Sequence, residues 1–150
     1  MFIHGGILHL IGNMWFLWIF GDNVEDNLGP GRFLLFYLAV GIIAGIFHVF
    51  SVSSAHWNVP VVGASGAISG VLGGYVVLFP KHRIKAFMLF LFRPYFFFVP
   101  AYIYVAIWFL YQLLYIGIPT AVAYTAHIGG FIGGMILILL LRRKIIRKDY

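Results

Sequence analysis

The sequence predicts an all-α bundle of membrane-spanning helices that forms one domain over residues 1–150. Hydrophobic residues make up 63% of the chain and charged residues only 9%, and the mean hydropathy is +1.00. Soluble domains carry about 25% charged residues, so this composition is typical of a polytopic membrane protein. A span of about 30 Å of hydrocarbon needs about 20 apolar residues. Runs of this kind give five expected spans: 5–21, 32–51, 59–79, 94–117 and 121–141.

The first two spans are joined by a polar turn segment over 21–31, and the second span ends at a loop over 52–58. The third span begins poorly as a helix because Pro60 and Gly63 lie in its first turns. A helix that begins near Ser65 and ends at Phe79 is about 22 Å long at the standard rise. The backbone before Ser65 is then irregular at membrane depth, which is tolerated only inside protein or beside a water-filled cavity.

The fourth span carries Pro100, which we expect to kink it, and aromatic side chains that suit a lipid-facing surface. In the fifth span, Gly130 and Gly134 are four residues apart and therefore lie on one helix face. Small residues in the third span recur at the same spacing, at 66, 70 and 74. Faces of this kind let two backbones approach closely, so we expect the third and fifth spans to pack together.

Every basic residue falls on one side of the expected bilayer if the chain starts outside. These residues are Arg32, Lys81, Arg83, Lys85, Arg93, Arg142, Arg143, Lys144, Arg147 and Lys148. The pattern follows the positive-inside rule and predicts a multi-pass protein of a prokaryotic plasma membrane with a cytoplasmic C-terminus. The net charge of +6 is then explained by the membrane topology and by attraction to anionic lipid. Because of this placement of the charges, we expect no nucleic-acid partner.

Polar side chains gather in the outer half of the expected bundle. His9 and Asn13 are four residues apart on one face of the first span, and His4 lies about one and a half turns above. His127 lies roughly 9 Å deep in the fifth span, at a depth similar to that of Ser65. Ionisable groups in a bilayer are costly and point to function. We therefore expect an aqueous pocket that opens to the outside, with Ser65 at its floor.

These groups are those of a serine hydrolase. A serine hydroxyl needs a base to become nucleophilic, and His127 lies on the span that is expected to pack against Ser65. His9, the Asn13 amide and the Ser65 N–H can donate to an oxyanion. All four acidic residues lie on the opposite side, so we expect a Ser–His dyad. The chain has no cysteine and no His-Glu-x-x-His helix, and His4 and His9 do not share a helix face, so we expect neither a metal site nor a cofactor.

Four segments carry a further pattern, namely HGGILHLIGN at 4–13, GDNVEDNLG at 21–29, GASG at 63–66 and AHIGG at 126–130. In this order and spacing they resemble the rhomboid family of intramembrane serine proteases. The resemblance implies Ser65 as nucleophile, His127 as general base, and His9 with Asn13 at the oxyanion hole. It also implies supporting positions at His4, Gly63, Gly66, Gly130 and Gly134. It implies no cofactor, and single-pass membrane proteins as substrates that are cut near their outer ends.

The chain departs from the family pattern at two places. The family core has six helices, and this chain begins where the second is expected, so we expect the first helix and the following loop to be missing and Met1 to be an internal methionine of a longer protein. Some relatives place an aromatic residue four positions after the nucleophile, where the base stacks on it. That position is Ser69 here, which we expect to bond locally instead.

Three other functions stay open at this point. The chain is also compatible with a non-catalytic rhomboid relative that binds membrane clients, or with an inactive fragment of the protease. A transport or channel subunit is disfavoured because the third span is apolar below Ser69 and offers no path for an ion. We expect His48 and His56 to have no role in the site, since neither matches a motif.

Overall fold

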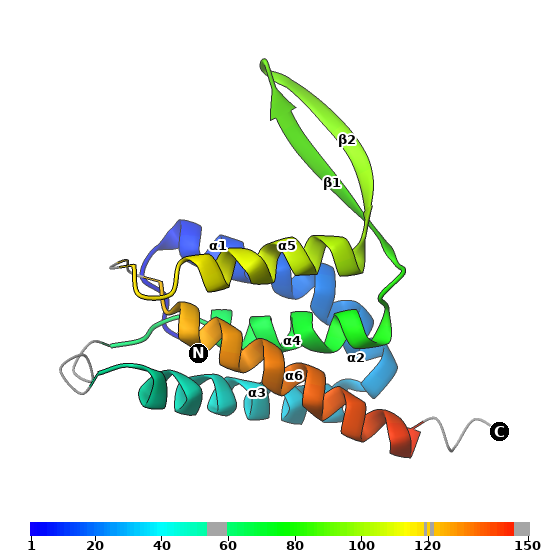
Figure 1. The fold of residues 1–150 in the computed structure, drawn as a ribbon. Helices are drawn as coiled ribbons and strands as arrows, with labels where there is room; N and C mark the ends of the chain where they lie inside the picture. The colour runs from blue at the N-terminus through cyan, green and yellow to red at the C-terminus, as the bar shows by residue number, and fades with distance from the viewer. Residues whose placement is uncertain (54–59, 119, 121, 146–150) are drawn as a thin grey trace.

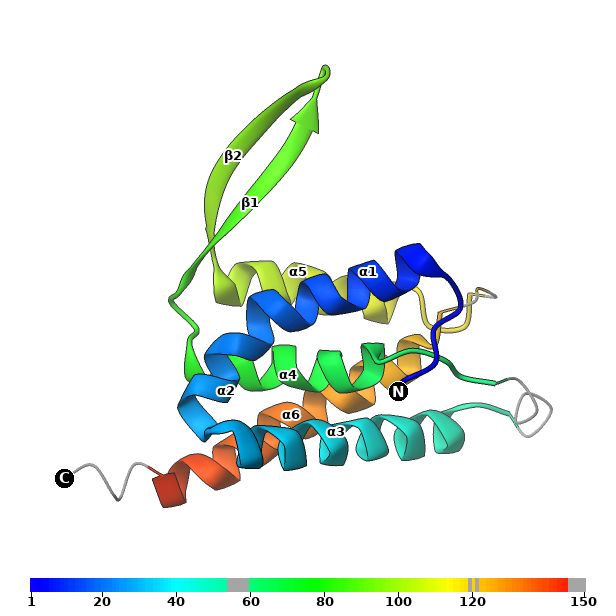
Figure 2. The same cartoon turned by 180° about the vertical axis from the view of Figure 1, so that it is seen from behind.

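Two long apolar helices, α3 (Pro30–Ser51) and α6 (Tyr124–Ile145), are each long enough to cross a membrane. They lie side by side on one face of the central helix α4 (Ser65–Leu78), and α1 (Ile7–Phe16) and α5 (Ala101–Leu114) lie on its other face (Figures 1 and 2). Helix α2 (Asp22–Leu28) lies at one end of the bundle and packs against both α3 and α4. The computed structural model describes residues 1–53, 60–118, 120 and 122–145. Within these residues the chain is mostly helical, as the composition predicts.

The first predicted span is continuous with a helix that the sequence did not predict. Helix α1 (Ile7–Phe16) passes through a short π-helical segment, η1 (Leu17–Gly21), into α2 (Asp22–Leu28). The expected turn over 21–31 is therefore wrong for most of its length. The chain reverses only at Gly29, whose φ of +80° suits glycine, and Pro30 then occupies the first turn of α3.

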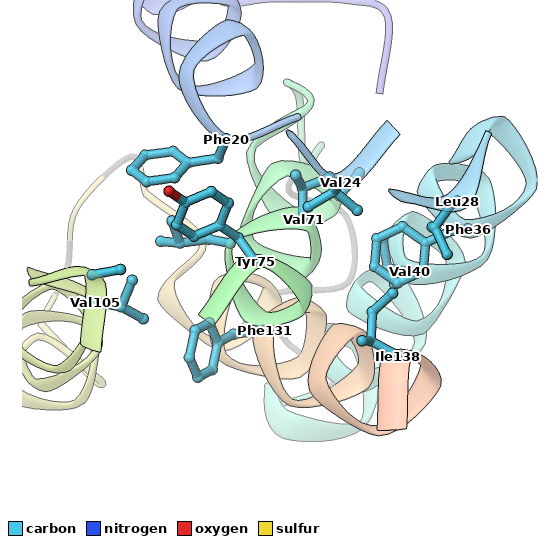
Figure 3. Packing of buried hydrophobic residues seen from close by; sticks show 13 residues of the cluster. Phe20, Val24, Leu28, Phe36, Val40, Val71, Tyr75, Val105, Phe131 and Ile138 are labelled. Carbon is cyan, nitrogen blue, oxygen red and sulfur yellow. The ribbon is translucent and has the colours of Figure 1, made fainter. Parts of the chain in front are cut away.

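Helix α4 forms the core of the bundle. Its residues are buried continuously from Ala67 to Tyr75, because other helices cover it on every side. Figure 3 shows apolar side chains from the surrounding helices packed around it. They include Phe20, Val40, Val105 and Ile138. Helix α4 begins at Ser65, as predicted, and its 14 residues span about 21 Å.

Glycine faces join α4 to α6, as the four-residue spacing predicts. A Cβ on Gly130 would collide with the backbone oxygen of Gly66, and a Cβ on Gly134 with that of Gly70. Backbone thus meets backbone along this contact, which only glycine permits. The two helices that carry the predicted nucleophile and base are consequently held at short range without intervening side chains.

The expectation of an all-α fold is wrong at residues 83–100. Strands β1 (Arg83–Phe90) and β2 (Arg93–Pro100) pair antiparallel and form a hairpin that projects from the bundle (Figure 1). Leu91 and Phe92 form its two-residue turn with φ values of +48° and +61°, the signs that a type I′ hairpin turn requires. The segment is rich in phenylalanine and tyrosine, which favour strands as well as apolar helices.

The predicted fourth span, 94–117, is consequently wrong in its first part. Helix α5 covers only Ala101–Leu114, which is 14 residues, and residues 94–100 belong to β2. Pro100 lies at the N-cap of α5 and does not kink a longer helix. Hydropathy alone could not separate the two cases, because strand and helix have the same apolar composition here.

The outer surfaces of α1, α3 and α5 are apolar. Side chains such as Ile7, Phe50 and Leu114 are 66–86% exposed, and many other large apolar side chains on these helices are exposed as well. A surface of this extent suits lipid and not water. It supports the interpretation of the chain as a membrane protein.

Candidate active site

Ser65 is placed by a turn that needs glycine. Gly63 has a φ of +106°, which L-residues with a side chain rarely adopt, and Ala64 then forms the N-cap of α4. A Cβ on Gly63 would lie 2.7 Å from Cε1 of His9. The glycine therefore both turns the chain into α4 and leaves room for the imidazole of His9. Since Ser65 is the first residue of the helix, its backbone N–H has no acceptor within the helix.

Ser65 and His127 lie within hydrogen-bonding distance. Nε2 of His127 is 2.8 Å from Oγ of Ser65, a distance that suits proton transfer from a hydroxyl to an imidazole. The two residues are 62 positions apart and come from α4 and α6. The close glycine contact between these helices brings them together.

The other ring nitrogen of His127 has a partner that the sequence reasoning missed. Nδ1 lies 2.8 Å from Oε1 of Gln112 on α5, and Gln112 is only 3% exposed. No motif singles out this glutamine. The available signal was an amide side chain in an otherwise apolar segment, since buried polar side chains in a membrane usually have a partner.

The imidazole of His127 is packed by rings from α5 and from its own helix. The ring of Trp108 is 6.3 Å away and tilted by 31°, and that of Tyr124 is 6.3 Å away and edge-on. Ser69, at the position where some relatives have an aromatic residue, donates instead to the Ser65 backbone oxygen at 2.6 Å. The predicted local bond of Ser69 is therefore confirmed.

The start of the chain brings His4, His9 and Asn13 to the same region. The rings of His4 and His9 are 5.4 Å apart and edge-on. The Gly5 N–H donates to Nδ1 of His9 at 3.4 Å, so Nε2 of His9 carries the proton and is a donor. Asn13 is the buried residue of α1, and its Nδ2 donates to the His9 backbone oxygen at 2.7 Å. Asn13 Oδ1 and His4 Nε2 are buried without a hydrogen-bond partner.

His9 and Asn13, but not His4, line one cavity of about 950 Å³ together with the dyad. Its walls include His9, Asn13, His48, Ser65, Trp108 and His127. The connections 60–62 and 116–118 also line it, which places the cavity at the end of the bundle opposite to α2 and the root of the hairpin (Figures 1 and 2). The arrangement offers a hydroxyl, an imidazole and several hydrogen-bond donors around one hollow.

His48, to which the sequence assigns no role, lines this cavity and bonds to Thr125. Its Nδ1 is 2.6 Å from Thr125 Oγ1. This contact joins α3 to α6 two residues before His127. His56 lies outside the described residues. Within the part of the chain that the structure describes, no group of three histidine or acidic side chains gathers that could hold a metal ion.

The chain matches a family model over most of its length. The model is described as Rhomboid domain and matches residues 1–144. Among curated proteins, the chain is 49% identical over 79 residues to the rhomboid protease GluP of Bacillus subtilis, which covers 51% of this chain and 14% of that protein. It is 33% identical over 89 residues to the mouse presenilin-associated rhomboid-like protein, mitochondrial, over 59% of this chain and 23% of that protein.

A third relative is the yeast Rhomboid protein 1, mitochondrial, which is 36% identical over 89 residues, or 58% of this chain and 26% of that protein. The matched part of this chain thus spans about a quarter or less of the length of these relatives. No solved structure gives a significant match.

Proposed function

The chain belongs to the rhomboid family of membrane proteins, and from this premise we propose that it is an intramembrane serine endopeptidase. One observation carries the proposal: the 2.8 Å contact between Ser65 Oγ and His127 Nε2 at the wall of a cavity. A non-catalytic client-binding relative has no need of this contact. We assign Ser65 as the nucleophile and His127 as the general base.

The dyad acts in two steps. Ser65 Oγ attacks the carbonyl carbon of the scissile peptide bond while its proton passes to His127 Nε2. The tetrahedral intermediate collapses when His127 returns that proton to the leaving amine, and an acyl ester remains on Ser65. A water molecule then attacks the ester and gives its proton to His127. This proton returns to Ser65 as the carboxylic acid product leaves.

Three donors are proposed for the oxyanion: the Ser65 N–H at the start of α4, the Nε2–H of His9, and the amide of Asn13. The Ser65 N–H is supported by its position in the first turn of the helix. His9 is supported by the bond from Gly5, which leaves its Nε2 as a donor. One hydrogen of the Asn13 NH₂ group is used by the His9 carbonyl, so we propose that the second one serves the oxyanion.

The topology supports a proposed location, and membership of the family supports a proposed substrate class. We propose that the five apolar segments form a polytopic bundle in a prokaryotic plasma membrane, with the cavity open to the outside and the C-terminus in the cytoplasm. The positive-inside pattern of the sequence supports this orientation, and Arg32 and Arg83 lie at the starts of α3 and β1, at the end of the bundle opposite to the cavity (Figure 1). The substrates are then single-pass membrane proteins that are cut near their outer ends.

Cleavage of a single-pass test substrate in liposomes tests the proposal. We expect the wild type to cleave it, and Ser65→Ala and His127→Ala to reduce cleavage to background. His82→Ala is the matched control, since His82 stacks on Phe79 outside the cavity, and we expect it to retain activity. Full cleavage by either dyad variant would overturn the mechanism. A wild-type chain that binds the substrate without cutting it would favour the non-catalytic function.

A further inference from the structure

We propose that Gln112 is a positioning residue that fixes the tautomer of His127, and that the backbone carbonyl of Trp108 in turn fixes the orientation of Gln112. This inference rests on the proposed function, because it concerns the base of the same dyad. It adds a third helix, α5, to the two that carry the dyad.

The hydrogen bonds of Gln112 determine which way its amide points. Gln112 Nε2 donates to the backbone oxygen of Trp108 at 3.2 Å. A carbonyl oxygen can only accept, so the NH₂ group must face it. The amide oxygen, Oε1, is then left facing His127 Nδ1 at 2.8 Å. A reversed amide would place two acceptors together at Trp108.

The orientation of the amide then determines where the proton of His127 lies. Gln112 Oε1 has no hydrogen to give, so the 2.8 Å contact requires that His127 Nδ1 carries the proton. A neutral imidazole that is protonated at Nδ1 has its lone pair at Nε2. This is the nitrogen that lies 2.8 Å from Ser65 Oγ. The hydroxyl can therefore donate to the ring, as a nucleophile that is about to lose its proton must do.

The opposite tautomer disrupts both contacts. With the proton on Nε2, Nδ1 and Gln112 Oε1 would be two acceptors in contact, and the ring could no longer accept the proton of Ser65. In an aspartate-containing triad, a wrong tautomer of this kind costs about 10⁴-fold in rate. Gln112 therefore orients the imidazole as the aspartate carboxylate does in such a triad, but it carries no charge.

The described part of the chain offers no other group in this role. Asp22, Glu25 and Asp26 all belong to α2, at the opposite end of the bundle (Figure 2). Ser69 donates to the Ser65 backbone oxygen and is not bonded to the ring. Trp108 and Gln112 are four residues apart on one face of α5, and both contact His127, one through its ring and one through its amide.

A neutral amide also suits this depth in a membrane. Gln112 is 3% exposed, and an ionised carboxylate at such a position is costly unless it is paired. The amide satisfies its donor at Trp108 and its acceptor at His127, so neither group is left without a partner. Burial of the orienting residue is therefore compatible with a stable fold.

The experiment compares Gln112→Leu and Gln112→Met with Gln112→Glu in the full chain in liposomes. Leu and Met fill a similar volume but cannot accept from Nδ1. We expect both to lower kcat by roughly 10- to 100-fold, with KM changed by less than about twofold. In its neutral form the carboxyl of Gln112→Glu offers both a donor for the Trp108 oxygen and an acceptor for Nδ1, and we expect this variant to recover most of the loss. Leu114→Ala is the control on the same helix, since Leu114 is 66% exposed, and we expect wild-type kinetics.

A ¹⁵N NMR spectrum of labelled histidine reads the tautomer directly, with His127 assigned by its loss in His127→Ala. We expect the proton on Nδ1 in the wild type and a mixture of tautomers in Gln112→Leu. An unchanged tautomer in Gln112→Leu, or an unchanged kcat, overturns the positioning role of Gln112 while Ser65→Ala and His127→Ala still abolish cleavage. If those two variants retain cleavage, the proposed function itself fails.

Discussion

Gly63→Ala should damage the site through His9 and the turn before α4. The added Cβ would lie 2.7 Å from His9 Cε1, so the ring must retreat by about 0.7 Å to restore an ordinary contact of 3.4 Å. A side chain at the φ of +106° also costs on the order of 1–3 kcal/mol. Misplacement of a catalytic group by about 1 Å can cost 10²-fold in rate. We therefore expect kcat to fall by roughly 10-fold or more, together with a loss of about 1–3 kcal/mol in the free energy of unfolding.

Cleavage kinetics in liposomes and thermal unfolding in detergent measure the two effects. Gly45→Ala is the matched control, because Gly45 lies within α3 and nothing lies within 4 Å of a Cβ built there. Alanine is favoured over glycine inside a helix by about 0.5–1 kcal/mol, so this variant should be as stable as the wild type or more so, with unchanged kinetics. Equal stability and equal kcat for the two variants would refute the role given to Gly63.

Three further predictions concern other parts of the molecule. Gly134→Val should separate α4 from α6, because even a Cβ collides with the Gly70 backbone oxygen, and thermal unfolding should report a loss of at least ~2 kcal/mol; wild-type stability would contradict the backbone contact. Asn13→Ala should lower kcat by about 10²-fold through loss of an oxyanion donor with little change in melting temperature, and an unchanged kcat would remove Asn13 from the oxyanion hole. Phe92 lies at the hairpin tip and its side chain is 95% exposed, so Phe92→Trp should add a fluorescence signal that lipid-attached quenchers reduce. A signal that only aqueous iodide quenches would place the tip in water.

The sequence predicted the parts of the fold that depend on close backbone contact. Glycine at every fourth position is informative because the missing Cβ has a direct consequence for how near two helices come. Gly66 with Gly130 and Gly70 with Gly134 meet as that spacing implies. The helix start at Ser65 was also predictable, because Pro60 and Gly63 disfavour a helix before it.

Features that depend on orientation were not predictable. The hairpin at 83–100 has the same apolar composition as a span, and hydropathy does not distinguish strand from helix there. The role of Gln112 could not be predicted because it depends on which side of α5 faces His127. The spacing of residues along the chain does not determine how one helix is rotated against another. Only the packed structure therefore identifies Gln112 Oε1 as the acceptor for His127 Nδ1.

The separation of 62 positions between Ser65 and His127 along the chain has a consequence for biosynthesis. The ribosome completes the segment with Ser65 long before it reaches His127, so during translation the serine enters the bilayer without any partner that could activate it. An interrupted translation product that stops before α6 holds an ordinary alcohol. Under the proposed mechanism, the growing chain cannot use Ser65 as a nucleophile until α6 has been made.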